Sequence, residues 1–255
     1  DLTEADAPVD ERRDDGEGGP GVRRDELDEL KQEGPQNISL LGDEAPDQRS
    51  KQQRVDDNIE AIRVLNVLDS ERRAPTREEQ AILAKYVGWG GISPELEALL
   101  GKDLNNWQDD AKRGRAERFE RSLKDDALDQ LKASVRTSFY TPAPVVRAIY
   151  DALLDLGLAG NVIKILEPSA GVGNFIGLLP DELAHANVTG VEIDDTTARI
   201  AKKLYRGHTI YHKSFEKAPL APNSFDVVVG NVPFSDAEGA PTGDWRKTVP
   251  SNVKH

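Results

Sequence analysis

The spacing of apolar residues predicts helices in the first half of the chain. Apolar positions recur there at intervals of three and four, which is the spacing of one buried helix face over about 52–72. These positions are Val55, Ile59, Ile62, Leu65 and Leu68. Thr76 and Glu79 have the spacing of a capping box and predict a second helix through about Val87. A polar helix is expected over about 109–133.

Two features of this helical segment could belong to a site. The Gly-Trp-Gly-Gly turn at 88–91 could bring a backbone or an aromatic face to a ligand, but a tryptophan in a turn is more typical of core packing. The basic residues between 112 and 121 alternate with Glu117 and Glu120, which is more typical of a solvated helix face than of a track of phosphate contacts. We expect packing and solvation, respectively.

Beyond about residue 140 the pattern changes to short apolar runs that alternate with helical spacing. The β-branched runs predict buried strands over 162–166, 188–193, 209–212 and 225–229. Strands that alternate with helices predict an α/β fold with a parallel, doubly wound, Rossmann-like sheet. Such a sheet binds its ligands beyond the carboxyl ends of its strands.

Charge is distributed unevenly and divides the chain further. Residues 1–50 hold 16 acidic and 6 basic residues, a net charge of -10, whereas the remaining residues hold 30 acidic and 27 basic. The first segment has few large apolar residues, so we expect a disordered acidic leader, more typical of a solvated spacer than of a tail that orders only against a partner. We expect a small helical subdomain over 51–136 and the α/β domain over 137–255. These two domains together carry a net charge close to zero. That charge permits a DNA-binding surface but does not by itself indicate one.

Composition excludes several classes of chemistry. The chain has no cysteine, which excludes disulfides, thiolate zinc sites and a cysteine nucleophile. Its four histidines lack the spacing of metal ligands, so we expect no metal. No apolar run reaches the roughly 18 residues of a membrane helix and no signal peptide opens the chain, so we expect an intracellular, cytoplasmic protein with no membrane partner. Because the sequence starts at Asp1 and contains no methionine, we expect a piece of a longer protein.

Polar or glycine-rich clusters follow the predicted strands. The first runs from Glu167 to Phe175 and contains Gly171 and Gly173, where glycines allow close backbone approach and the N–H groups of a helix start favour an anionic group. Several nucleotide-binding folds share such a turn. About 20 residues later, Glu192 ends the next strand, where an acid can accept both ribose hydroxyls of an adenosine. Together the two clusters predict a nucleotide-type cofactor.

Two further clusters follow the third and fourth strands. They are Ser214 and Phe215, and then Asn231, Val232, Pro233 and Phe234. An amide, a proline and an aromatic ring at the mouth of a sheet suit methylation of a planar amine, because amide and carbonyl oxygens can accept its hydrogens while the aromatic face holds its ring. Alone, this segment would be read as a turn with a buried phenylalanine. Its place beside the other clusters favours catalysis.

In their order these motifs resemble the adenine-specific amino DNA methyltransferases of the gamma arrangement. The matching segments are 138–142 (Ser-Phe-Tyr-Thr-Pro), 167–175, 190–194 and 231–234. Segments 86–91 (Tyr-Val-Gly-Trp-Gly-Gly) and 230–234 resemble more narrowly the large methyltransferase-helicase proteins of phages and mobile elements, which include DarB-like antirestriction proteins.

The resemblance implies an S-adenosylmethionine-dependent methyltransferase of Rossmann-like fold that acts on the exocyclic amine of adenine in DNA. The base would be flipped out of the duplex and the methyl group transferred directly, without a covalent intermediate. Implied partners are DNA and downstream domains of the same polypeptide, a helicase among them. Carriage in a phage particle is one implied location.

By position, the resemblance also implies the site residues. S-adenosylmethionine would be held by Tyr140, Thr141, Pro142, Glu167, Pro168, Ala170, Gly171, Gly173, Asn174, Phe175, Glu192, Ile193, Ser214 and Phe215. Glu192 would hold the ribose and Phe215 would pack on the cofactor's adenine. The catalytic residues would be Asn231 and the Val232 carbonyl, which grip the amine, with Pro233 and with Phe234 stacked on the base.

Two positions depart from the family pattern. The general family has proline at Val232 and often aspartate at Ser214. Valine frees the backbone at the accepting carbonyl, and serine gives a weaker, neutral contact to the cofactor. We expect the later strands of the sheet to lie beyond His255.

Two alternatives to DNA methylation stay open. The same amide and aromatic motif would serve the methylation of a protein glutamine or of an amine in RNA. A catalytically idle module that acts as a scaffold or as a component of a particle is the other alternative, and the acidic leader mildly favours it.

Overall fold

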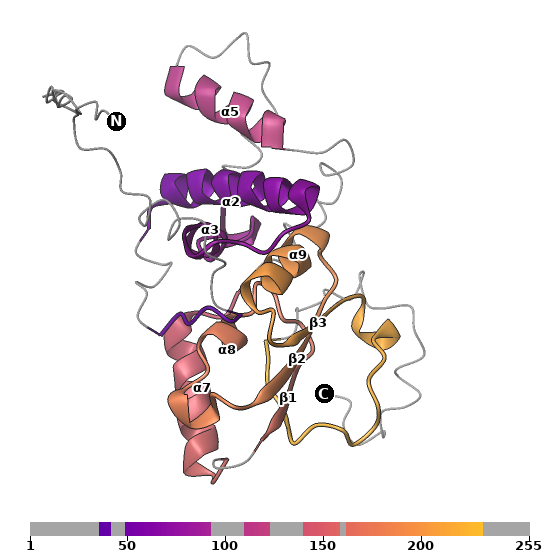
Figure 1. Ribbon diagram of the computed structural model, residues 1–255. Coiled ribbons are helices and arrows are strands. Elements are labelled where there is room, and N and C mark those ends of the chain that lie inside the picture. Colours follow the sequence, from indigo (N-terminus) through magenta and orange to yellow (C-terminus); the bar gives the residue numbers. More distant parts are fainter. Residues whose placement is uncertain (1–35, 42–48, 93–109, 123–139, 159–161, 232–255) are drawn as a thin grey trace, which may run out of the picture. The chain divides into compact units, whose positions relative to one another are not determined.

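The computed structural model describes residues 36–41, 49–92, 110–122, 140–158 and 162–231 (Figure 1). These ranges all belong to one compact unit, Glu33–His255. Within them, no helix combines the length and the apolar character that a membrane crossing requires.

A parallel sheet carries the second half of the described chain. Its strands are β1 (Lys164–Glu167), β2 (Asn187–Glu192), β3 (Thr209–His212) and β4 (Val227–Val228), in the order β3-β2-β1-β4. From β1 the chain builds outward in one direction through β2 and β3 and then returns to add β4 on the other side. The topological switch point therefore lies between β1 and β4, which is where such a sheet binds its ligand. The predicted parallel α/β fold is confirmed.

The sheet packs one face into the core. Ile165, Val188 and Val227 occupy one row of register partners across β1, β2 and β4; the first two belong to the core and Val227 is partly buried against it. Because side chains alternate between the faces of a strand, the next residue, Val228, points to the other face and is 64% exposed.

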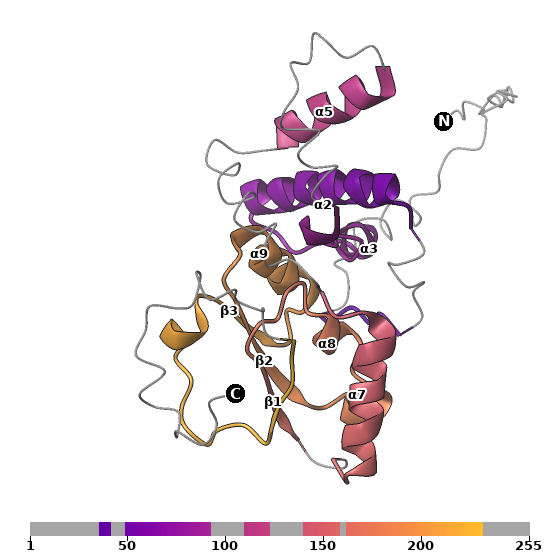
Figure 2. The same ribbon diagram turned by 180° about the vertical axis from the view of Figure 1, so that it is seen from behind.

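Helices cover the buried face. These are α7 (Ala143–Asp155), α8 (Asn174–Gly177) and α9 (Asp195–Leu204), with 3-10 turns at Asp181–Leu183 and Phe215–Lys217. Helices α7 and α8 lie side by side in both views (Figures 1 and 2). The hydroxyl of Tyr150 in α7 donates to the Phe175 carbonyl in α8 at 2.7 Å, so the two helices are joined in the core.

A helical layer makes up the first half of the described chain. It comprises α2 (Lys51–Glu71), α3 (Arg77–Leu83), the 3-10 turn Gly90–Ile92 and α5 (Asp110–Ser122). The predicted capping box at Thr76 and Glu79 is present. Helix α3 ends earlier than predicted, because the side chain of Asn58 binds the Gly88 carbonyl at 2.7 Å and the Val87 N–H at 2.9 Å and so holds this segment in a turn.

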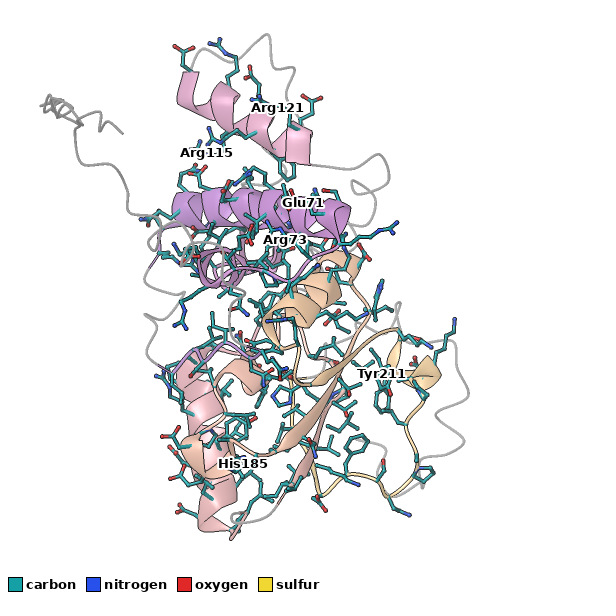
Figure 3. All side chains as sticks on the ribbon, in the orientation of Figure 1. Glu71, Arg73, Arg115, Arg121, His185 and Tyr211 are labelled. Carbon is teal, nitrogen blue, oxygen red and sulfur yellow. The ribbon has the colours of Figure 1, made fainter. Side chains whose placement is uncertain are left out.

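The tryptophan and the basic residues of the helical layer serve the packing and solvation predicted for them. Trp89 is fully buried and packs edge-on against Phe119 of α5, with ring centroids 5.3 Å apart. Arg115, which Figure 3 shows on the side of α5 that faces α2, binds Asp56 at 3.1 Å. Exposed Arg121 lies near Glu117 on its own helix. Positive charge on α5 is therefore largely neutralised locally.

Ion pairs join the helical layer to α9. Arg199 of α9 binds Asp69 of α2 through its Nε at 2.8 Å and Asp195 at 2.7 Å, and Lys203 lies 3.3 Å from the same Asp69. These side chains are less than one third exposed, so the pairs are more shielded from solvent than ordinary surface pairs.

Part of the segment predicted as a free leader lies against the α/β domain. The Ile38 N–H donates to the Leu204 carbonyl at 3.1 Å and the Leu40 N–H to the Gly177 carbonyl at 2.7 Å. Asn37 also accepts from the Gly207 N–H at 3.0 Å. Residues 36–41, which are less acidic than the segment before them, thus act as a clasp across α8 and the end of α9.

Candidate cofactor and catalytic site

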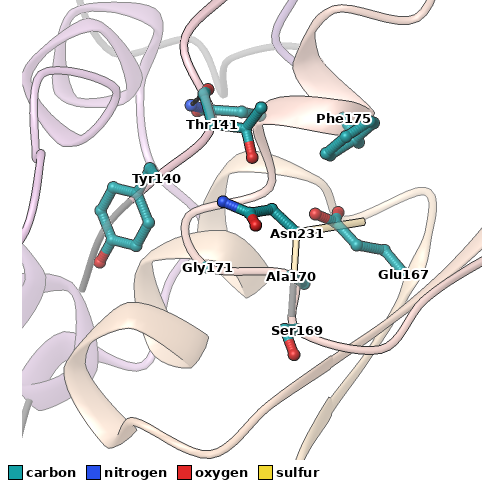
Figure 4. Close-up of a pocket in the computed structure, with 9 residues that line it drawn as sticks. Tyr140, Thr141, Glu167, Ser169, Ala170, Gly171, Phe175 and Asn231 are labelled. Carbon is teal, nitrogen blue, oxygen red and sulfur yellow. Dashed lines mark hydrogen bonds between the residues drawn. The ribbon is translucent and has the colours of Figure 1, made fainter. Parts of the chain in front are cut away.

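The ends of β1 and β4 meet at the switch point and form a pocket. It is lined by Tyr140, Thr141, Glu167, Ser169, Ala170, Gly171, Asn174, Phe175 and Asn231 (Figure 4). All but Ser169 are among the residues predicted for the site. Ser169 lies inside the first motif but was not among the predicted site residues.

The glycine turn after β1 is shaped by two positive backbone angles. Gly171 has φ +56° and Gly173 has φ +85°, a region that residues with a side chain rarely adopt. A Cβ atom on Gly171 would lie 2.7 Å from the ring of Tyr140, whereas one on Gly173 would lie 2.5 Å from the ring of Tyr205. Gly171 therefore lies directly against Tyr140, a residue of the pocket. At position 173 glycine is required because the ring of Tyr205 leaves no room for a side chain.

The segment before α7 forms the opposite wall of the pocket. The Asn174 side-chain amide donates to the Thr141 carbonyl at 3.0 Å, which ties this segment to the helix that opens after the glycine turn. Pro142 then begins α7 as its N-cap. The order Tyr140, Thr141, Pro142 thus places one aromatic ring and one nearly buried hydroxyl against the turn.

Glu192, at the end of β2, is bound to the same turn. One carboxylate oxygen accepts the Gly171 N–H at 2.8 Å and the other accepts the Asp194 N–H at 2.7 Å. Each oxygen has two lone-pair positions, so each can accept one further hydrogen bond from a hydroxyl. Burial raises the pKa of this carboxyl, and the backbone N–H groups of Asp194, Gly171 and Ile193 act against that rise.

Three further residues predicted to hold the cofactor lie at the ends of β2 and β3. Ile193 after β2 is 63% exposed, and Phe215 after β3 is 49% exposed, while Ser214 is half-buried. Exposed apolar side chains at strand ends offer two surfaces for a flat aromatic group. These three residues do not line the pocket of Figure 4.

Asn231 lies just after β4 and lines the pocket. Val229 is bound to β1 through its N–H and the Leu166 carbonyl at 2.9 Å, and a Cβ on Gly230 would lie 3.3 Å from the Pro168 ring. This close approach sets the start of the loop against the end of β1, and Asn231, which is exposed, faces the pocket beside Glu167 and Gly171. Val232, Pro233 and Phe234 lie outside the described residues.

Glu167 is the buried carboxyl group of the site. It is 3% exposed, and its Oε2 has no hydrogen-bond partner within the described part of the chain. Burial, and then the charge of Glu192, raise the pKa of Glu167 well above its ordinary value. A buried carboxylate oxygen without a partner fits a ligand that brings a cationic or hydrogen-donating group. The ammonium group of S-adenosylmethionine is such a group, so the residues present fit this cofactor.

Comparisons with known proteins agree with this geometry. Residues 166–236 match the family model described as a methyltransferase domain. Defense against restriction protein B of Escherichia phage P1 is 28% identical over 179 residues, which cover 69% of this chain and 6% of that protein. Type II methyltransferase M.CvrRI of Paramecium bursaria Chlorella virus XZ-6E is 30% identical over 116 residues, 46% of this chain and 28% of that protein.

Modification methylase CviBIII of Chlorella virus NC1A is 27% identical over 107 residues and is also covered over 28% of its length. The chain thus spans less than a third of the length of each of these relatives. A solved chain described as a class I S-adenosylmethionine-dependent methyltransferase from Listeria monocytogenes shares 15% identity, with a TM-score of 0.34 over 71% of this chain and 59% of that one. Residues 166–236 thus match a methyltransferase domain, for which S-adenosylmethionine is the implied cofactor, and they lie in a parallel, Rossmann-like α/β fold.

Replacing Glu167 with glutamine is expected to raise the free energy of unfolding of the cofactor-free protein near pH 7 by about 1 kcal/mol, because a neutral amide is not penalised for ionisation in a buried site. The native carboxyl keeps its proton to a higher pH than the unfolded one. Its contribution to stability is therefore fully present below the ordinary pKa of 4.5 and is lost as pH rises through the raised native pKa. Thermal unfolding from about pH 5 to about pH 8 would measure this difference.

Glu60→Gln is the matched control. The hydrogen bond with Arg63 lowers the pKa of Glu60, so the native Glu60 carboxylate adds stability as pH rises and its replacement should remove that gain. The two variants should thus differ from the unmodified protein with opposite signs. A parallel pH dependence of the unmodified protein and Glu167→Gln would contradict the argument.

Proposed function

We propose that this domain transfers a methyl group from S-adenosylmethionine to the exocyclic amine of adenine in DNA. The observation that carries the proposal is the position of Asn231, which faces the same pocket as Glu167 and Gly171 at the switch point. An amide oxygen there can accept a hydrogen from an amine held against the cofactor's methyl group. The relatives named as a type II methyltransferase and a modification methylase support DNA as the substrate.

The proposed roles follow the position of each side chain. When bound, S-adenosylmethionine supplies a methyl group activated by a sulfonium centre. Glu192 accepts the ribose hydroxyls, the free oxygen of Glu167 accepts from the ammonium end, and Ile193 and Phe215 hold the adenine ring. These residues would hold the cofactor at both ends and so present its methyl group to an amine bound by Asn231.

Asn231 orients the attacking amine. The lone pair of an exocyclic amine is delocalised into its ring, and hydrogen bonds from both amine hydrogens to oxygen acceptors favour attack by that nitrogen. The Asn231 oxygen is one acceptor, and the Val232 carbonyl is proposed as the other, with Pro233 restricting the loop and Phe234 stacking on the base. The amine nitrogen forms the new C–N bond as the methyl–sulfur bond breaks, and its proton leaves to water. The base reaches this position by flipping out of the duplex.

The wider setting is also proposed from the relatives. The match to an antirestriction protein of a phage favours a role in modifying phage or mobile-element DNA inside a cell. Carriage of this protein in a phage particle is proposed as well. The proposed partners are duplex DNA and further domains of a larger polypeptide, a helicase among them. The acidic leader is proposed to bind another protein.

The test is transfer of a labelled methyl group from S-adenosylmethionine to unmethylated duplex DNA, with RNA and a glutamine-containing peptide as parallel substrates. We expect label in the DNA, and chromatography of the hydrolysed DNA should place it on adenine. Label on cytosine, RNA or the peptide would reassign the substrate. Calorimetrically detected cofactor binding with no transfer to any substrate would favour the catalytically idle module.

A further inference from the structure

Tyr86 belongs to the helical layer and has no part in the proposed chemistry, yet it lies beside the cofactor site. It follows α3 and is 3% exposed. Its hydroxyl contacts the side chains of Thr197, the third residue of α9, and of Trp89. Burial raises the pKa of Tyr86 well above its ordinary value, so this group is a neutral hydroxyl throughout the physiological range.

Thr197 connects Tyr86 to the pocket. Its hydroxyl lies 3.1 Å from the hydroxyl of Tyr140, and its side chain is almost completely buried. A threonine hydroxyl has one donor and two acceptor positions, so it can bind both tyrosine hydroxyls at the same time. A buried chain of three hydroxyl groups thus joins the helical layer, α9 and the pocket wall.

Tyr140, at the far end of this chain, covers the glycine turn. Its ring lies so close to Gly171 that a Cβ atom there would be 2.7 Å from the ring Cδ1. The N–H of the same Gly171 binds Glu192. A displacement of the Tyr140 ring therefore changes both a wall of the pocket and the space above the turn that holds the ribose acid.

The first turn of α9 provides a second connection to the same site. Asp194 caps α9 by accepting the Thr197 N–H at 2.8 Å, and its own N–H donates to Glu192 at 2.7 Å. Thr197, which contacts the Tyr86 hydroxyl, is thus bound to the capping residue whose N–H binds Glu192. Further along α9, Arg199 and Lys203 attach the helix to Asp69 of the helical layer.

We propose that Tyr86 is a positioning residue for the cofactor: through Thr197 it fixes the ring of Tyr140 over the glycine turn, so that docking of the helical layer sets the affinity for S-adenosylmethionine. The inference rests on the cofactor role that the proposed function gives to Tyr140 and Glu192. The helical layer is then part of the methyltransferase site and more than a neighbouring subdomain.

The test measures S-adenosylmethionine binding by calorimetry in Tyr86→Phe, which keeps the buried ring and removes only the hydroxyl. We expect about fivefold weaker binding, the effect of one lost neutral hydrogen bond. Ile59→Val is the matched control, because it removes one buried methyl group from α2 without touching the hydroxyls. It should lower the unfolding temperature with unchanged cofactor affinity. Equal cofactor affinity in Tyr86→Phe and the unmodified protein would overturn the inference.

A double variant tests whether Tyr86 acts through Tyr140. If it does, the combination of Tyr86→Phe with Tyr140→Phe binds the cofactor no more weakly than Tyr140→Phe alone, whereas independent effects would multiply and overturn the inference. Failure of the unmodified protein to bind the cofactor would overturn both the inference and the proposed function. Cofactor binding without methyl transfer to DNA would overturn only the proposed function, and the loss of affinity in Tyr86→Phe would still support the inference.

Discussion

Replacing Asn231 with alanine is expected to lower the rate of methyl transfer to DNA by about 100-fold or more, while S-adenosylmethionine still binds. The side chain is exposed and faces the pocket at the switch point, so its loss removes an acceptor for the reacting amine without opening a cavity in the core. Single-turnover transfer with saturating cofactor measures the chemical effect, and calorimetry measures cofactor binding separately.

Two further variants make the test of Asn231 specific. Asn187→Ala removes another exposed asparagine from the opposite, amino end of the sheet and should leave the transfer rate unchanged. Asn231→Asp keeps an oxygen acceptor at the same place and should retain more activity than Asn231→Ala. If Asn231→Ala transferred methyl groups as fast as Asn187→Ala, the proposed grip on the amine would be wrong.

A methyl group added at Gly171 is expected to weaken S-adenosylmethionine binding by at least about tenfold. Alanine there would adopt an unfavourable positive φ, and its Cβ would lie 2.7 Å from the Tyr140 ring, which must then move away from the turn. The same displacement would disturb the N–H that binds Glu192. Calorimetric titration of Gly171→Ala with the cofactor measures this loss.

Gly157→Ala separates backbone strain from the steric effect. Gly157 also has a positive φ, of +91°, but a Cβ atom there would meet no atom within 4 Å. This variant should lose about 1 kcal/mol of stability and keep its cofactor affinity. Equal cofactor affinity in the two variants would show that the contact between Gly171 and Tyr140 does not shape the site.

The sequence predicted those parts of the fold that depend on local patterns. The strand at 209–212 has the predicted bounds, and the capping box of α3 is formed by the predicted pair. The motifs after β1 and β4 meet in one pocket because parallel strands end at the same edge of a sheet. Alternating apolar runs were sufficient to predict that edge.

These local patterns could not predict contacts between segments that are far apart in the sequence. The early end of α3 depends on Asn58, 30 residues before the carbonyl it binds, and no propensity near Val87 encodes that hydrogen bond. The glycine at 173 accommodates Tyr205, and the clasp at 36–41 depends on carbonyl groups of α8 and α9. Tyr86 shows the same difficulty, since its sequence neighbours indicate packing and only the fold places it against Thr197. The roles of Val232, Pro233 and Phe234 stay predictions.

The ion pair between Asp69 and Arg199 has a consequence for the order in which the protein is made. The two residues are 130 positions apart, so the helical layer leaves the ribosome long before the helix that completes its pairing. At about 5 to 20 residues per second, Asp69 waits roughly 6 to 26 seconds for its partner. During synthesis the helical layer therefore exists for a time without α9 against α2 and α3, with Asp69 hydrated by water in place of its ion pair.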